Sequence, residues 1–270
     1  MRVLLAQIAP VDGDLAANCT RLEGILAAAP GADLAVFPEL FLSGYAAGTS
    51  PAMGRRREDE PLRRVRAAAA AADTALITGF AELGDDGELY DSALCVDRDG
   101  SLAGVHRKAY RFGAERKCFR AGDQLHVFEL AGWRIAPLIC FEIEFPEPAR
   151  AVVLAGAELL VTVAANMAPY RGDHDLASRA RALDNRVPHV YVNRVGTEAG
   201  LEFVGGSQVI DAGGRLLAAA GATEEILLRT LRAEPRSAPD LDYLNQLREP
   251  LPVIGGDAKT AVSWPGKALG

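Results

Sequence analysis

The chain has 270 residues, of which 49% are hydrophobic, and its net charge is −7. This length allows one large domain or two small ones with a sizeable core. The acidic balance excludes a dominant basic surface, so neither nucleic acid nor an anionic membrane is an expected partner. The four cysteines form no CxxC pair, which disfavours a disulfide framework or a zinc site and favours reduced thiols in a cytoplasmic protein.

Strand-like and helix-like segments alternate along the chain. In the first half we predict strands at 2–8, 34–37, 75–80, 89–96 and 102–106, and helices at 15–29 and 62–72. In the second half we predict strands at 127–130, 134–140, 159–164, 189–195, 204–211, 216–219 and 226–230, and helices at 147–155, 177–186 and 240–247.

Hairpins accompany this βα alternation, which predicts an α/β protein with two sheets packed on each other and helices outside. The sequence shows no linker between domains. We therefore expect one domain over residues 1–250, followed by an extended tail rich in Pro and Gly at 251–270.

A carboxylate follows the strand predicted at 34–37. Pro38 ends this strand, and Glu39 stands at its exit. A carboxylate among apolar neighbours has a raised pKa and can exchange protons near neutral pH. The alternative is that Glu39 is a helix cap or a surface carboxylate.

Two further polar side chains come just after predicted strands. Lys108 follows the strand at 102–106, where it could stabilise negative charge on a reacting carbonyl or be an ordinary surface lysine. Cys140 ends the apolar run at 133–140, just before a helix. A thiolate can be stabilised at such a position, although most free cysteines are core residues.

Strand ends in a layered α/β protein meet on one rim, where active sites form. Glu39, Lys108 and Cys140 are therefore predicted to act together as a proton shuttle, an oxyanion clamp and a nucleophile. Cys118 is a weaker candidate for the nucleophile because no strand positions it in its polar loop.

Three segments resemble the nitrilase superfamily, the carbon–nitrogen hydrolases: FPELFLSGY (37–45), HRKAYRFGAERKCFRAG (106–122) and CFEIEFPE (140–147). The resemblance runs from about residue 2 to about residue 250. It implies an αββα sandwich of two mixed β-sheets with outer helices, which becomes a four-layer αββα–αββα assembly when two subunits pair. It also implies a Glu39, Lys108 and Cys140 triad, with Glu115 as an auxiliary carboxylate and the backbone N–H of Phe141 as an oxyanion donor. It implies no metal and no organic cofactor.

One departure from the family pattern follows the nucleophile. The family commonly has Tyr-Asp there, whereas this chain has Phe-Glu, which could alter the shape of the pocket. Aromatic residues beside the triad either wall the pocket or belong to the core, and the segment 165–174 is expected at the pocket mouth. His174 in that segment is predicted to be a helix-start or packing residue. The candidate substrate contacts are Tyr45, Phe112, Glu142, Asn166, Met167 and Arg171.

The resemblance implies an amidase that hydrolyses a small linear carboxamide to a carboxylic acid and ammonia through a Cys140 thioester. The alternatives are an N-carbamoyl amine or amino-acid amidohydrolase, a nitrilase, or a ligand-binding protein without catalysis. Apolar residues near the C-terminus predict a homodimer or a larger homo-oligomer, because such residues often need a partner to bury them. These residues are Leu241, Tyr243, Leu244 and Leu247.

Overall fold

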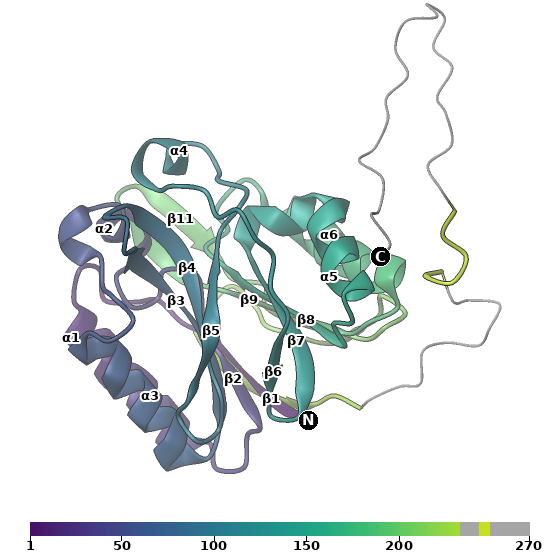
Figure 1. The fold of residues 1–270 in the computed structure, drawn as a ribbon, viewed down its shortest axis with the longest axis horizontal. Coiled ribbons are helices and arrows are strands. Elements are labelled where there is room, and N and C mark those ends of the chain that lie inside the picture. The colour runs from purple at the N-terminus through teal and green to yellow at the C-terminus, as the bar shows by residue number, and fades with distance from the viewer. Residues whose placement is uncertain (233–242, 249–270) are drawn as a thin grey trace, which may run out of the picture.

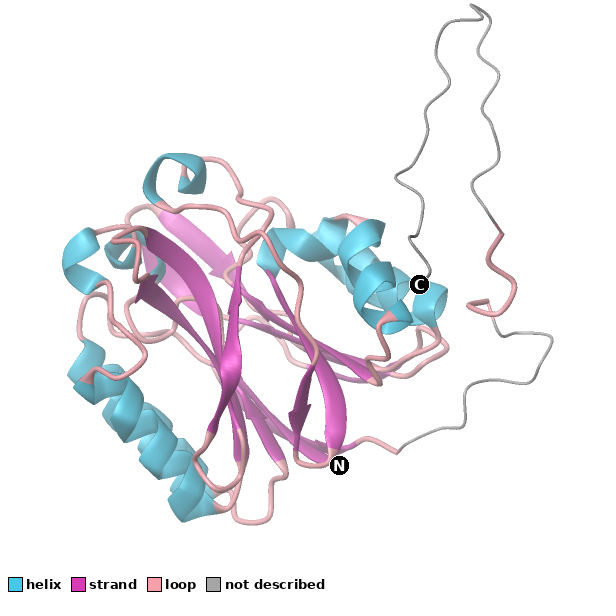
Figure 2. Cartoon of the chain, in the orientation of Figure 1, coloured by secondary structure: helices cyan, strands magenta, loops and turns pink. Residues whose placement is uncertain are grey.

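The computed structural model describes residues 1–232 and 243–248. Two six-stranded mixed sheets face each other, and helices cover their outer sides (Figure 1, Figure 2). This confirms the predicted αββα sandwich within one chain. Among the residues described, no helix combines the length and apolar character needed to cross a bilayer.

The first sheet has the strand order β14-β1-β2-β3-β4-β5, with β1, β2 and β3 parallel. Its strands are β1 (Arg2–Gln7), β2 (Leu34–Val36), β3 (Ala75–Leu83), β4 (Leu89–Val96), β5 (Leu102–Arg107) and β14 (Glu225–Thr230). Its outer face carries helices α1 (Leu15–Ala28) and α3 (Glu60–Ala72).

The second sheet has the order β13-β12-β9-β8-β7-β6, with β7, β8 and β9 parallel. Its strands are β6 (Phe128–Leu130), β7 (Trp133–Ile139), β8 (Leu159–Ala164), β9 (His189–Asn193), β12 (Gln208–Ile210) and β13 (Leu216–Ala219). Helices α5 (Pro146–Leu154) and α6 (Arg171–Asn185) lie on its outer side. A separate two-stranded sheet pairs β10 (Val195–Glu198) with β11 (Leu201–Val204).

Four short helical turns complete the elements. They are α2 (Tyr45–Gly48), η1 (Pro51–Met53), α4 (Glu115–Cys118) and η2 (Cys140–Glu144). The turns α2, α4 and η2 carry predicted site residues, and none of them was expected as a separate element.

Strand β1 is a continuous apolar run because both of its faces are buried. Val3 and Leu5 belong to the core between the two sheets, whereas Leu4 and Ala6 pack in the core beneath α1 and α3. Because side chains alternate across a strand, burial on both faces requires apolar residues at every position. The same pattern gives β2, β3 and β8 their hydrophobic sequences.

The structure corrects four predicted elements. The strand predicted at 189–195 is divided between β9 and β10, which belong to different sheets. Helix α6 begins at Arg171, six residues before the predicted start, because its first turns are polar and lack an apolar repeat. The strand predicted at 204–211 is divided between β11 and β12, since Gly205 and Gly206 between them take positive φ angles. In place of the last predicted helix, residues 243–246 form turns, and 240–242 lie outside the described residues. The tail predicted at 251–270 also lies outside them.

Candidate active site

Cys140 stands where β7 ends and η2 begins. Its φ angle of +46° is in the left-handed region, which residues other than glycine adopt infrequently and which is enriched at functional sites. The turn brings the thiol to the wall of a cavity while the residue stays 7% exposed. The strand and the strained turn together therefore present a buried thiol to a small ligand.

Glu39 is held by close packing of its backbone against β3. The Gly79 N–H donates to the Pro38 carbonyl at 3.0 Å, and a Cβ on Gly79 would lie 2.6 Å from the Glu39 Cα and 2.2 Å from the Leu40 nitrogen. Only glycine allows this approach without a shift of one segment. The Glu39 carboxylate also accepts the Ala165 N–H at 2.6 Å, which ties it to the second sheet.

Gly79→Ala should therefore displace the segment that carries Glu39. We expect kcat/KM to fall about 100-fold, the loss typical of a misplacement near 1 Å. Gly24→Ala is the matched control, because Gly24 is exposed in α1 with nothing within 4 Å of a new Cβ, and alanine should slightly stabilise that helix. Steady-state kinetics and thermal unfolding of both variants make the test. Wild-type kcat/KM in Gly79→Ala would show that the close approach does not position Glu39.

Lys108 follows β5 and lies among three carboxyl groups. Its Nζ atom is 2.5 Å from Glu39 Oε1, 2.9 Å from Glu115 and 3.4 Å from Asp91 Oδ2. Oxygens of these three carboxyls lie within 4.8 Å of one another, a spacing that could suit a metal ion. The Lys108 ammonium already supplies the positive charge at their centre.

The charges of this cluster set the proton affinities of its members. Burial alone would raise the pKa of Glu39, but the Lys108 charge and hydrogen bonds outweigh burial and lower that pKa. Burial alone would lower the pKa of Lys108, but the neighbouring carboxylates raise it well above its usual value. Glu39 and Lys108 therefore form a buried ion pair.

Two predictions about protonation were wrong. Glu39 does not have a raised pKa, because its nearest neighbour is a cation and not apolar surface. The Cys140 thiolate is not stabilised either, because burial and then the Glu39 charge raise the pKa of Cys140 well above its usual value. The thiol is therefore neutral, and the ionised Glu39, whose charge acts on it, is a base placed to remove its proton.

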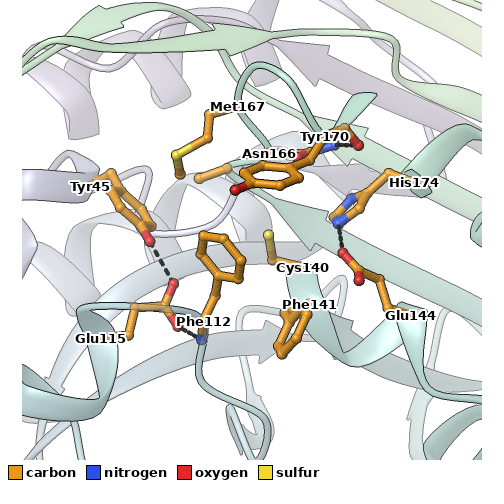
Figure 3. Close-up of a pocket in the computed structure, with 11 residues that line it drawn as sticks. Tyr45, Phe112, Glu115, Cys140, Phe141, Glu144, Asn166, Met167, Tyr170 and His174 are labelled. Carbon is orange, nitrogen blue, oxygen red and sulfur yellow. Dashed lines mark hydrogen bonds and ion pairs between the residues drawn. The ribbon is translucent and has the colours of Figure 1, made fainter. Parts of the chain in front are cut away.

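The cavity above Cys140 has about 280 Å³ of empty space, part of it open to solvent. In Figure 3 the Cys140 sulfur lies at its centre, with Phe112, Tyr170 and His174 around it. The lining consists of Tyr45, Phe112, Glu115, Cys140, Phe141, Glu144, Ala165, Asn166, Met167, Tyr170 and His174. Aromatic walls and a few polar groups of this kind suit a small molecule. Glu39 and Lys108 do not line the cavity and are fully buried.

Four of the six candidate substrate contacts line this cavity: Tyr45, Phe112, Asn166 and Met167. Tyr45 donates its hydroxyl hydrogen bond to Glu115 at 2.6 Å, so it also orders the auxiliary carboxylate. Phe112 packs edge-on against Phe141, with ring centroids 5.3 Å apart. Glu115 accepts the Phe112 N–H at 2.7 Å, which holds the loop that carries Phe112.

The structure does not bring Glu142 and Arg171 into the cavity lining. Glu142 is fully buried and accepts the N–H groups of Ala109 and Ile139, each at 2.7 Å, while contacting His106 at 2.9 Å. It therefore ties the segment of Lys108 to that of Cys140, and substitutions there act on the backbone instead of on the substrate. Arg171 begins α6 and contacts Asp175 at 3.5 Å.

Sequence reasoning missed three features of this site. Glu144 lines the cavity and lies 3.2 Å from His174 (Figure 3). His174 is a packing residue near the start of α6, as predicted, and contacts the Tyr191 hydroxyl at 2.9 Å. It also lines the cavity, which was not predicted. The third is Asp91, whose signal was a charged residue inside the strand predicted at 89–96, which is otherwise mostly apolar.

Comparison with known proteins identifies the family. The carbon-nitrogen hydrolase family matches residues 2–238. An (R)-stereoselective amidase from Pseudomonas sp. is 38% identical over 256 residues, which cover 92% of each chain.

Solved structures agree. An amidase of the nitrilase superfamily from Nesterenkonia AN1 superposes with a TM-score of 0.82 at 29% identity, covering 92% of this chain and 95% of that one. Another structure of the Nesterenkonia amidase, with a TM-score of 0.80, 29% identity and coverage of 92% and 94%, shows covalent addition of the acetamide moiety of fluoroacetamide at its active-site cysteine. The chain is thus a member of the carbon-nitrogen hydrolase family, an amidase of the nitrilase superfamily that acts on non-peptide carbon–nitrogen bonds.

Proposed function

We propose that this amidase hydrolyses a small linear carboxamide to a carboxylic acid and ammonia through a thioester on Cys140. One observation carries the proposal: a neutral, buried Cys140 thiol stands beside the ionised Glu39, whose carboxylate lies 2.5 Å from the Lys108 ammonium. In that arrangement the base is present and ionised before the substrate arrives.

The first half of the reaction forms the thioester. Glu39 takes the Cys140 proton as the sulfur attacks the amide carbon, and the carbonyl oxygen becomes an oxyanion. The Lys108 ammonium and the N–H of Phe141 stabilise this charge. That N–H is in the first turn of η2, where helical N–H groups have no partner within the helix. Protonated Glu39 then passes its proton to the nitrogen, the carbon–nitrogen bond breaks, and ammonia leaves.

The second half releases the acid. Glu39, again a carboxylate, takes a proton from water as the water oxygen attacks the thioester carbon. The carbon–sulfur bond then breaks, and Glu39 returns its proton to the Cys140 sulfur. The carboxylic acid leaves and the starting state is restored. The same carboxylate serves as base and acid in both halves.

The cavity supports a small acyl group without a negative charge. Phe112, Phe141 and Tyr170 give it apolar walls, and among the described residues its lining contains the acidic Glu115 and Glu144 and no lysine or arginine. An acyl group ending in a carboxylate would meet Glu144 without a compensating fixed cation. Neutral aliphatic or aromatic amides are therefore the first substrates to try.

The test is ammonia release from matched amides, nitriles and N-carbamoyl compounds, with Cys140→Ala as the control. We expect Cys140-dependent release from neutral amides, and less from the same amides carrying a terminal carboxylate. Release accompanied by carbon dioxide from the carbamoyl compounds would replace the proposal by a carbamoylase, and release from nitriles alone by a nitrilase. No release from any class, with no adduct on Cys140 in intact-mass spectra, would refute the thioester mechanism for these substrates.

A further inference from the structure

Asp91 is a second buried carboxyl beside the Lys108–Glu39 pair. It lies on β4, is fully buried as a side chain, and its backbone carbonyl accepts the Lys108 N–H at 2.9 Å. The mechanism above gives it no role. Its neighbours in the cluster are Glu39, Lys108 and Glu115.

The charges of the cluster do not balance if every acid is ionised. One ammonium, Lys108, would face the three carboxylates of Glu39, Glu115 and Asp91, all buried. The Cys140 thiol and the Tyr45 phenol add no positive charge. An uncompensated charge away from water is strongly disfavoured, and groups in that position bind a proton instead. At least one of the three carboxyls is therefore neutral.

The hydrogen bonds show which carboxyl carries the proton. Glu39 accepts from Lys108 and from the Ala165 N–H, and Glu115 accepts from Lys108, Tyr45 and the Phe112 N–H. Neither oxygen of Asp91 accepts a hydrogen bond from a donor group, and its contact with Lys108 is the longest of the three. An ionised carboxylate can only accept, whereas a protonated one can donate. Asp91 is therefore the carboxyl that gives up the fewest accepted hydrogen bonds when it becomes neutral.

We propose that Asp91 is held as a neutral carboxylic acid that donates its proton in a hydrogen bond to Glu39 and thereby positions and tunes that base. Burial and the charge of Glu39 both raise the pKa of Asp91 well above its usual value, and the contact with Asp91 helps lower the pKa of Glu39. Asp91 is a positioning residue, because it acts on the substrate only through Glu39.

The first test needs no catalysis and compares urea unfolding of wild type and Asp91→Asn between pH 5 and 8. In the unfolded chain Asp91 ionises near pH ~4. The pKa of Asp91 is raised in the folded protein. The stability that the neutral Asp91 contributes is therefore complete below the unfolded pKa and is lost as the pH rises towards the folded pKa. We therefore expect the unfolding constant of wild type, divided by that of Asp91→Asn, to rise with pH, by up to about tenfold per pH unit below the folded pKa. A ratio that stays constant would show that Asp91 is ionised in the folded protein.

Asp85→Asn is the matched control. Its side chain is exposed and pairs only at the surface with Arg56. It should give a constant ratio over the same range. A ratio for Asp85→Asn as steep as that for Asp91→Asn would remove the support for a buried proton.

The second test places the proton on Asp91 and not on Glu39, and it rests on the proposed function. Asp91→Asn keeps a neutral hydrogen-bond donor at this position. The acidic limb of the plot of kcat/KM against pH, which reports the pKa of Glu39, should therefore stay in place. Asp91→Ala removes the donor, so the pKa of Glu39 should rise and the limb should move up by about one pH unit.

If instead Asp91 were the ionised partner, Asp91→Asn would remove a negative charge and move the limb to lower pH, which would overturn the proposal. Asp91→Asn decides the result even if the alanine variant does not fold. Were the enzyme inactive on every amide tested, the proposed function would fail while the unfolding comparison still tested Asp91.

Discussion

Cys140→Ala is expected to reduce amide turnover by about 10⁶-fold, the loss measured when the nucleophile of another hydrolase is removed. No other cysteine can replace it. Cys19 and Cys95 are buried away from the cavity, with their pKa values raised by burial, and Cys118 is exposed on α4. The alanine variant should keep the wild-type stability to within about 1 kcal/mol, because only one sulfur atom at the edge of a cavity is lost.

Ammonia release under saturating amide and urea unfolding measure the two effects. Cys118→Ala is the matched control, and it should retain wild-type turnover. Intact-mass spectra of Cys118→Ala after reaction with a haloacetamide should show a Cys140 adduct, which should be absent when Cys140→Ala is added, because the exposed Cys118 thiol would otherwise be alkylated as well. Substantial turnover by Cys140→Ala would exclude the thioester.

Lys108→Met is expected to reduce both activity and stability. It removes the cation from a buried group of three carboxyls, and breaking a buried ion pair on one side destabilises a protein by about 3–5 kcal/mol. It also removes an oxyanion donor, which lowers kcat by about 10²–10³-fold. Lys117→Met on α4 is the control, because Lys117 is exposed and its loss should change stability by less than about 0.5 kcal/mol.

The loss of stability in Lys108→Met should depend on pH and should be larger at neutral pH than at acidic pH. In wild type the pKa of Glu39 lies below its usual value of 4.5, so its contribution to stability is complete above about pH 4.5 and is lost as the pH falls through the folded value. Without Lys108, burial raises that pKa, and the variant loses stability as the pH rises. The difference in unfolding free energy between the two proteins should therefore shrink from pH 7 to pH 4. A difference independent of pH would mean that Lys108 stabilises the fold by packing and not by charge.

The fold could be predicted because its signals are local. β1 and β8 are short apolar runs, and Asp14 caps the start of α1 by accepting the Ala17 N–H at 2.9 Å. Such patterns follow from burial and capping and need no knowledge of distant residues. The start of α6 was missed because its first turns are polar, and their place in the fold comes from packing of His174 against Tyr191.

The gathering of Glu39, Lys108 and Cys140 could also be predicted, since each comes just after a strand and strand ends meet on one rim. Their protonation could not. It depends on charges that different elements bring within a few ångströms, and the lowered pKa of Glu39 and the raised pKa of Cys140 both reverse the prediction. Glu142 shows the same limit, because nothing in its neighbours along the chain indicates that it binds two backbone segments.

The sequence by itself therefore determined the layered α/β fold, the family and the three side chains that come together. Only the tertiary structure decided which groups around them are charged, which line the cavity, and that Asp91 lies among them. The physical reason is that hydrophobic periodicity is written along the chain, whereas electrostatic interactions act through space between residues far apart in the sequence.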